Sequence, residues 1–112
     1  MDMEYEMRGP YLIVHVGSEL DHHRAECLKA GLHKIERERG IKYIIFDFNG
    51  TGFMDSSGVG LLISRYRDLS MSGGNVYASG VCPAVKKLFY VSGLHKIIGV
   101  YEKVEDIIYG EK

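Results

Sequence analysis

The sequence predicts an α/β domain with a mixed, mostly parallel β-sheet that an antiparallel hairpin opens and about four helices pack against. Three observations support this prediction. The chain has 112 residues, the size of one domain, so we expect a single domain over residues 1–112. The first two predicted strands are separated only by a Gly-Pro turn, as in a hairpin. Strands and amphipathic helices then alternate, and right-handed crossovers between such strands build a parallel sheet.

The opening hairpin is predicted from residues 3–16. Apolar and polar residues alternate over residues 3–8, which is the period of a half-exposed strand. Gly9 and Pro10 interrupt this alternation. The apolar run at residues 11–16 is therefore expected to be the antiparallel partner.

A first helix is predicted between Asp21 and Arg39. Asp21 has a short acidic side chain that accepts hydrogen bonds from the free amides of a helix N-terminus. Gly40 readily adopts the left-handed conformation in which many helices end. Apolar residues recur between these ends at spacings of three and four, which places them on one face. They are Ala25, Leu28, Leu32 and Ile35.

A buried strand and a second helix follow. Residues 43–48 are rich in β-formers and mostly apolar at successive positions, as in a strand that is covered on both faces. After the turn at residues 49–52, we expect a helix from about Ser57 to the Gly73-Gly74 pair. Its inward face is expected to comprise Val59, Leu62, Ile63, Tyr66 and Leu69.

The rest of the chain predicts a strand, a helix, a strand and a helix. Residues 75–78 form the first strand, and Pro83 suits the first turn of a helix that ends near Ser92. Residues 97–101 are expected to form the last strand. A short terminal helix then follows, with the apolar residues Val104, Ile107 and Ile108.

The composition argues against several classes of protein. Lys and Arg number 14 against 15 Asp and Glu, a net charge of −1, so we expect no nucleic-acid partner. The apolar runs are far shorter than the ~20 residues that cross a bilayer, and the acidic N-terminus lacks the apolar segment of a signal peptide. Cys27 and Cys82 form no CxxC motif. We therefore expect a cytoplasmic protein without a membrane partner.

The most unusual local sequence is FMDSSGVG at residues 53–60, at the start of the second predicted helix. One interpretation is helix capping, because Asp or Ser can accept a hydrogen bond from an amide two or three residues on. Capping needs only one of these side chains, however, and each glycine costs a helix about 1 kcal/mol relative to alanine. Glycine backbone also allows another molecule to approach closely. The predicted partner-binding surface comprises Asp55, Ser56, Ser57, Gly58 and Gly60.

Enzymatic chemistry at these serines has weaker support. The G-x-S-x-G pattern is absent because Met54 lies two residues before Ser56, and Asp55 lies two residues before Ser57. The two glycines lack the third glycine of a dinucleotide-binding fingerprint, and no Gly-Lys-Ser/Thr follows. A small serine hydrolase or a nucleotide-binding protein is therefore the alternative from a different class.

The run Asp21-His22-His23 invites a metal interpretation. Neighbouring side chains on a helix diverge by about 100°, so two adjacent imidazoles do not readily share one ion. A zinc site also needs three or four ligands. We expect two solvent-facing imidazoles at the start of a helix, with no metal and no cofactor.

Three separated motifs, in the same order, resemble the STAS domain of bacterial anti-sigma factor antagonists over nearly the whole chain. They are ELD at residues 19–21, FMDSSG at residues 53–58 and PAVKKLFYVSGL at residues 83–94. The two histidines after ELD, together with Arg65-Tyr66 and residues 94–98, resemble the sporulation branch, the anti-sigma-F factor antagonists. The resemblance implies a STAS-like fold. Ser18 looks inserted between Gly17 and Glu19, which could reshape the turn before Asp21.

The resemblance implies a regulatory binding module that is not an enzyme. For the oligomeric state, a monomer is the default expectation. The resemblance implies that the anti-sigma factor, an ATP-dependent serine kinase, phosphorylates Ser56. The dephospho form binds this kinase and frees the sigma factor, phosphorylation switches binding off, and a PP2C-type phosphatase resets the phosphorylated form. Asp21 matches a region that contacts the kinase. The alternative within the family is the antagonist of a general-stress sigma factor.

Overall fold

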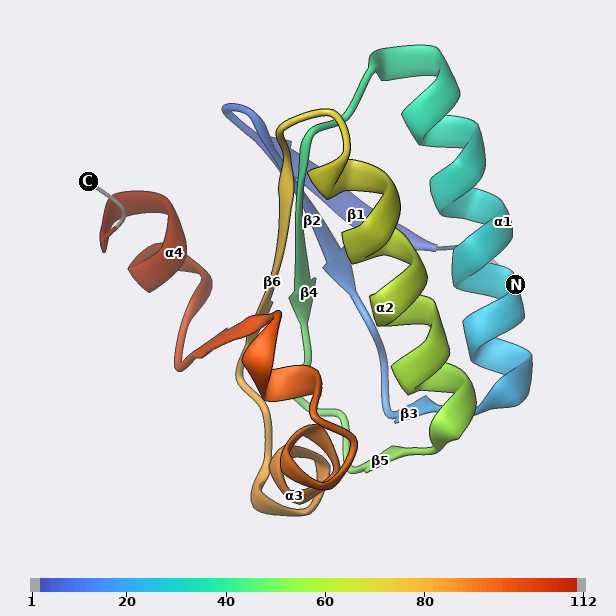
Figure 1. Cartoon of the computed structure of the whole chain (residues 1–112), viewed down its shortest axis with the longest axis vertical. Coiled ribbons are helices and arrows are strands. Elements are labelled where there is room, and N and C mark those ends of the chain that lie inside the picture. Colours follow the sequence, from blue (N-terminus) through green and yellow to red (C-terminus); the bar gives the residue numbers. More distant parts are fainter. Residues whose placement is uncertain (1–2, 111–112) are drawn as a thin grey trace.

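The structure is a computed structural model that describes residues 3–110, with α1 and α2 on one face of a central sheet and α4 on the other (Figure 1). The strands of the central sheet are β1 (Glu4–Arg8), β2 (Tyr11–His15), β4 (Tyr43–Asp47), β6 (Asn75–Ser79) and β7 (Gly99–Tyr101). The helices are α1 (His22–Arg39), α2 (Ser56–Ser70), α3 (Pro83–Val91) and α4 (Val104–Gly110), with a 3-10 helix, η1, at Leu94–Lys96. A small separate sheet contains β3 (Glu19–Leu20) and β5 (Phe53–Met54).

The central sheet is mixed and mostly parallel, as the sequence predicts. Its strand order is β1-β2-β4-β6-β7. The hairpin pair β1-β2 is antiparallel, and the other neighbouring pairs are parallel. The parallel pairing requires crossover connections, and α1, α2 and α3 provide them. The predicted fold class is confirmed.

The first helix agrees with the sequence in detail. Asp21 is its N-cap, and Gly40 ends it in the left-handed conformation with φ of 61°. The predicted apolar face is its buried face, which comprises Ala25, Leu28, Leu32 and Ile35. Periodicity and capping are local signals, so the sequence was sufficient to predict this element.

The structure differs from the predicted elements at the last strand and at two short strands. The last strand begins later than predicted, at Gly99, because Ile97 and Ile98 form the turn after η1, in which their amides donate to the carbonyl oxygen of Leu94 at 3.1 and 3.0 Å. The strands β3 and β5 were not predicted, because two residues are too few to show the alternation of a strand.

The inward face of α2 also differs from the prediction. Ile63 and Tyr66 are only half-buried, and Arg65 is buried with 1% of its surface exposed. Its Nη1 donates to Oε1 of Glu36 in α1 at 2.6 Å, and its Nη2 donates to Asp68. Burial of a charge requires such partners, so this cation and the carboxylate of Glu36 link the two helices.

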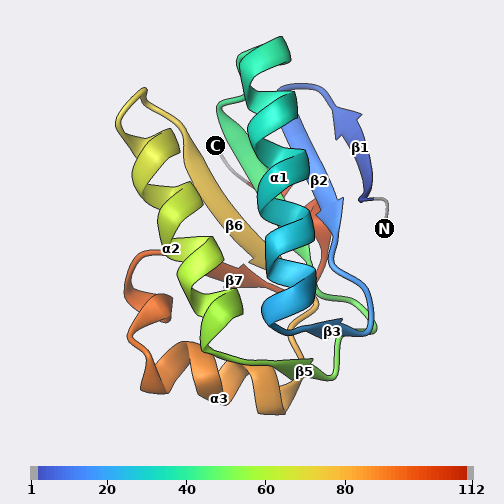
Figure 2. The ribbon, with the colours of Figure 1, turned by 90° about the vertical axis from the view of Figure 1, so that its right-hand side faces the viewer.

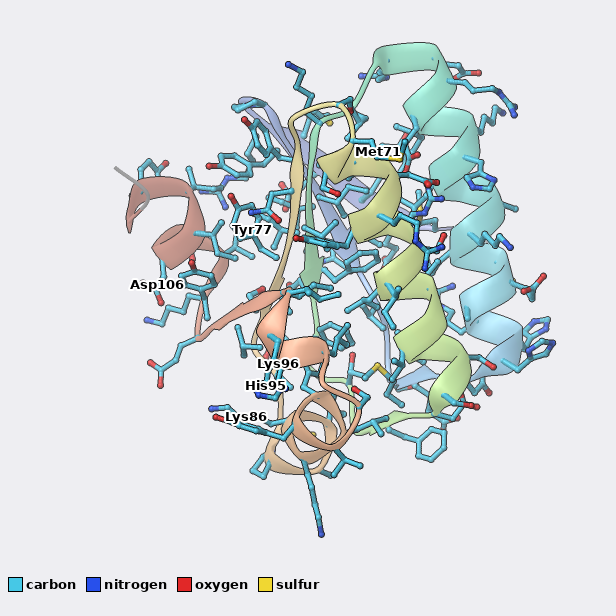
Figure 3. The ribbon with its side chains drawn as sticks, in the orientation of Figure 1. Met71, Tyr77, Lys86, His95, Lys96 and Asp106 are labelled. Carbon is cyan, nitrogen blue, oxygen red and sulfur yellow. The ribbon has the colours of Figure 1, made fainter. Side chains whose placement is uncertain are left out.

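The central strand β4 is covered on both faces. Its residues Ile44, Ile45 and Phe46 have no exposed surface. On the side away from α1 and α2, a smaller cluster joins Ile45 to Ile107 of α4 and to a group of tyrosines. These are Tyr11, Tyr43, Tyr77 and Tyr101, and Figure 3 shows Tyr77 projecting from β6 towards α4. None of the helices in residues 3–110 is both long and apolar enough to cross a bilayer.

The small sheet packs under the first turn of α2 (Figure 2). β3 and β5 are parallel, with Leu20 paired to Met54. Both side chains are buried. A Cβ on Gly58 would lie 2.6 Å from Cγ of Met54 and 2.8 Å from Cγ of Leu20. Gly58 therefore lets the helix pack closely on the small sheet.

Replacing Arg65 with Ala should lower the free energy of unfolding by about 3–5 kcal/mol, because it leaves the Glu36 carboxylate, 16% exposed, without its cation. Urea denaturation followed by circular dichroism measures this loss. Asp68→Asn is the matched control, because the Asp68 side chain is 54% exposed, and it should cost less than about 1 kcal/mol. Equal losses for the two variants would contradict the prediction.

Gly58→Ala should destabilise the protein by about 1–3 kcal/mol, because the buried side chains of Leu20 and Met54 must move to admit the new methyl group. Gly60→Ala is the matched control. Apart from its chain neighbours and the backbone of its own helix, a Cβ at Gly60 has no described atom within 4 Å, so this change should stabilise the helix by about 1 kcal/mol. Thermal denaturation of both variants tests the difference, and a melting temperature that is no lower for Gly58→Ala would disprove it.

Candidate functional site

The starts of α1 and α2 lie side by side at one edge of the molecule (Figure 2). The parallel pairing of β3 with β5 aligns Leu20 and Met54, which immediately precede the two N-caps. The amide of Asp55 also donates to the carbonyl oxygen of Leu20 at 3.2 Å. This pairing brings Asp21 and Asp55 to the same edge, although they are far apart in the sequence.

Both aspartates cap their helices. Oδ1 of Asp21 accepts from the amide of Arg24 at 2.9 Å, and Oδ1 of Asp55 accepts from the amide of Ser57 at 2.8 Å. Each carboxylate thus satisfies an amide that has no partner within its own helix. Both residues are half-buried, so part of each side chain stays accessible at this edge.

Ser56 is exposed at the first position of α2. No hydrogen bond among residues 3–110 involves its hydroxyl. The free amides and the dipole of a helix N-terminus favour negative charge. This hydroxyl is therefore accessible to another protein, at a position where an added anion is tolerated.

Ser57 has a different environment from its neighbour. It is half-buried, and its Oγ lies 3.3 Å from Nδ1 of His22 at the start of α1. His22 and His23 are both exposed, as predicted. Sequence analysis did not identify His22 as a contact of Ser57, because only the pairing of β3 with β5 brings the two helices into register.

The two glycines of α2 have separate roles, and the predicted role of Gly58 needs correction. Gly58 is buried against Leu20 and Met54, so its backbone is not available to a partner. Gly60 is exposed, and a Cβ there would meet no described atom within 4 Å apart from its chain neighbours and the backbone of α2. Of these two residues, only Gly60 leaves bare backbone on the surface.

The turn before Asp21 is fixed by hydrogen bonds. Gly17 has φ of 99°, in the left-handed region that favours glycine. Its carbonyl oxygen accepts from the hydroxyl of Thr51, and the carbonyl oxygen of Ser18 accepts from the amide of Gly52 at 2.9 Å. The loop after β4 thus holds the segment that contains Ser18 and leads to the cap of α1.

The surface near the start of α2 includes an exposed aromatic ring and a groove between α1 and α2. Phe53 of β5 is 49% exposed. Sequence analysis considered this residue only as part of the FMDSSG motif and did not predict that its ring is exposed. A groove of about 240 Å³ between α1 and α2 is lined by His22, Ser57, Gly60 and Ser64, among others. A single exposed ring is common on protein surfaces, so Phe53 is a candidate contact because it lies three residues before Ser56.

The described residues provide few groups that could bind a metal ion. Within residues 3–110, no group of three or more His, Cys, Asp and Glu side chains is placed to hold a metal ion. His23 lies beside Cys27 instead, with Nε2 3.9 Å from Sγ. What this edge can do is present a free hydroxyl and an open backbone to a partner.

Comparison with known proteins identifies a family for the chain. The STAS domain model matches residues 2–107. The chain is 32% identical over 102 residues to the anti-sigma F factor antagonist of Paenibacillus polymyxa, covering 91% of this chain and 87% of that protein. It is 28% identical over 105 residues to the anti-sigma-B factor antagonist of Staphylococcus aureus, covering 94% and 96% respectively.

Two solved structures of SpoIIAA are also similar to this fold. The unphosphorylated anti-sigma factor antagonist SpoIIAA matches with a TM-score of 0.84 and 31% identity over 99% of both chains. The phosphorylated form of SpoIIAA, a Bacillus cell fate determinant, matches with a TM-score of 0.76 and 30% identity over 98% of this chain and 100% of that one. The chain belongs to the STAS domain family, among its anti-sigma factor antagonists.

Proposed function

We propose that the chain is the anti-sigma factor antagonist of a sporulation pathway. Its dephospho form binds an anti-sigma factor that is an ATP-dependent serine kinase, and this binding releases the sigma factor. Phosphorylation of Ser56 by the same kinase ends binding, and a PP2C-type phosphatase restores the active form. The chain acts as a monomeric binding module and kinase substrate, not as an enzyme.

The observation that carries this proposal is the free, exposed hydroxyl of Ser56 at the first position of α2. A phosphate acceptor must reach the active site of another protein, and Ser56 lies on an edge with the exposed ring of Phe53 and the open backbone of Gly60. The proposed docking surface comprises Asp21, Phe53, Asp55, Ser56, Ser57 and Gly60. It differs from the sequence prediction by including Phe53 and omitting Gly58.

Electrostatics explain how one phosphate would act as a switch without refolding the domain. A phosphoserine adds about −1.5 to −2 charges, which the N-terminus of α2 tolerates. Asp55 is adjacent and acidic, and the guanidinium Nε of Arg24 is already bonded to the carbonyl oxygen of Val16 at 2.9 Å. A dianion buried there by a partner would lose its hydration next to the Asp55 carboxylate, and burial of a charge that is not fully paired costs several kcal/mol.

The choice of the sporulation pathway rests on similarity to the Paenibacillus polymyxa antagonist, which is higher than to the Staphylococcus aureus anti-sigma-B factor antagonist. The two histidines after Asp21 also favour the sporulation pathway. Pull-down of the chain with each of the two kinds of anti-sigma factor tests this choice. Preferential capture by a general-stress anti-sigma factor would reassign the pathway and leave the type of function intact.

A serine hydrolase has one observation in its favour, the contact between Nδ1 of His22 and Oγ of Ser57. A nucleophile and a base need this proximity, but the base is normally oriented by a third group. Among residues 3–110, no carboxylate bonds to the imidazole of His22, which is exposed. The regulatory function is therefore better supported, and ester turnover by the purified chain would reverse this preference.

Phosphorylation of Ser56 should weaken binding to the cognate kinase by about 100-fold or more, because every ~1.4 kcal/mol of desolvation cost is tenfold in affinity. Titration calorimetry of the dephospho and phosphorylated forms measures the loss. Circular dichroism should show the same fold for both. Equal affinities would rule the switch out, and an unfolded phosphorylated form would replace local blocking with refolding.

Ser56→Ala should bind the kinase within about threefold of the original chain, since it removes only an exposed hydroxyl that has no hydrogen-bonding partner within residues 3–110. It should accept no phosphate in the presence of ATP, as mass spectrometry will show. Ser57→Ala is the matched control and should still be phosphorylated. Phosphate on Ser57 in the original chain would reassign the acceptor.

A further inference from the structure

The two adjacent serines at the start of α2 are chemically identical, yet their surroundings are not. The hydroxyl of Ser56 is exposed and has no hydrogen-bonding partner among residues 3–110, and Ser57 is half-buried with its hydroxyl on the imidazole of His22. The amide of Ser57 is also held, by the carboxylate of Asp55 at 2.8 Å. Backbone and side chain of Ser57 are therefore both restrained.

We propose that His22 selects the phosphate acceptor. It lies on the neighbouring helix and bonds the hydroxyl of Ser57, which keeps this hydroxyl from reacting with ATP on the kinase and leaves Ser56 as the serine that reacts. The inference rests on the function proposed above and concerns the same site. His22 is a positioning residue in this account, because it acts through Ser57 and does not touch the reacting atoms.

The chemistry of transfer requires a mobile hydroxyl. The serine oxygen attacks the γ-phosphorus of ATP, a new oxygen–phosphorus bond forms, and the bond to the departing ADP breaks with its electron pair on ADP. The hydroxyl proton passes to a base and then to water. A hydroxyl that is bonded to His22 must first leave this partner and turn out of the groove between α1 and α2, in which both side chains lie. In the described part of the chain, the hydroxyl of Ser56 has no such bond to break.

Consecutive serines create a need for selection. Neighbouring Cα atoms are only about 3.8 Å apart, so a kinase that docks on this edge can bring either residue near its ATP by a small shift. Side chains of adjacent helical residues diverge by about 100°, which directs Ser57 towards α1. This direction alone could exclude Ser57, so the test must separate the effect of direction from that of the bond to His22.

The test measures phosphorylation of Ser57 in chains that lack Ser56. The purified chain, the kinase that it binds and ATP are mixed, and mass spectrometry follows phosphate on Ser57. The variants are Ser56→Ala alone and the same change combined with His22→Ala, His22→Asn or His23→Ala. Initial rates are compared at saturating chain concentration, so that altered affinity for the kinase does not enter.

We expect His22→Ala to raise the rate of Ser57 phosphorylation by about fivefold, which corresponds to one ordinary hydrogen bond of about 1 kcal/mol. His22→Asn should restore the slow rate, because its amide can again bond the hydroxyl. His23→Ala is the matched control: this imidazole is equally exposed but lies beside Cys27, so its loss should change nothing. A rate for His22→Ala no higher than for His23→Ala would overturn the inference and leave direction as the cause.

A second measurement does not need the kinase. The ¹⁵N chemical shift of Nδ1 of His22 should change in Ser57→Ala and stay the same in Ser56→Ala, because among residues 3–110 it is the hydroxyl of Ser57, and not that of Ser56, that lies within hydrogen-bonding distance of this nitrogen. An unchanged shift in Ser57→Ala would disprove the contact and the selection by His22. A failure of the original chain to accept phosphate on Ser56 would instead disprove the proposed function, so the two failures are distinguishable.

Discussion

The pairing of two very short strands determines the geometry of the candidate site. Leu20 of β3 and Met54 of β5 lie side by side in a parallel pair, and their buried side chains meet Gly58 in the first turn of α2. Each strand leads directly into the N-cap of a long helix. The pairing therefore aligns the starts of α1 and α2, and every contact between these two starts depends on it.

This alignment gives two neighbouring serines different properties. The helix N-terminus places Ser56 outward and favours an anion there, while α1 supplies an imidazole to the hydroxyl of Ser57. The caps Asp21 and Asp55 satisfy backbone amides next to both residues. The first turn of α2 is thus held in place before any partner binds, so a phosphate can change the surface without a change of fold.

Two further sets of stabilising contacts lie away from the candidate site. The buried pair of Arg65 and Glu36 links α1 and α2 away from their N-terminal ends, and the tyrosines on the opposite face of the sheet pack against α4. Rings of Tyr11 and Tyr43 lie 5.5 Å apart, and those of Tyr77 and Tyr101 lie 6.2 Å apart. Since these contacts support the sheet and the helices independently, the edge at Ser56 can expose a phenylalanine and a glycine without loss of the core.

Local sequence by itself determined most of the elements and the capping residues of the site, because helix caps, apolar periods and glycine turns act over a few neighbouring residues. Asp21, Gly40 and the exposed hydroxyl of Ser56 belong to this class. Only the tertiary structure decided that Gly58 is buried, that Arg65 points inward and that His22 meets Ser57. Each of these depends on which distant segment lies opposite a side chain, and two-residue strands leave no periodic pattern from which that partner could be predicted.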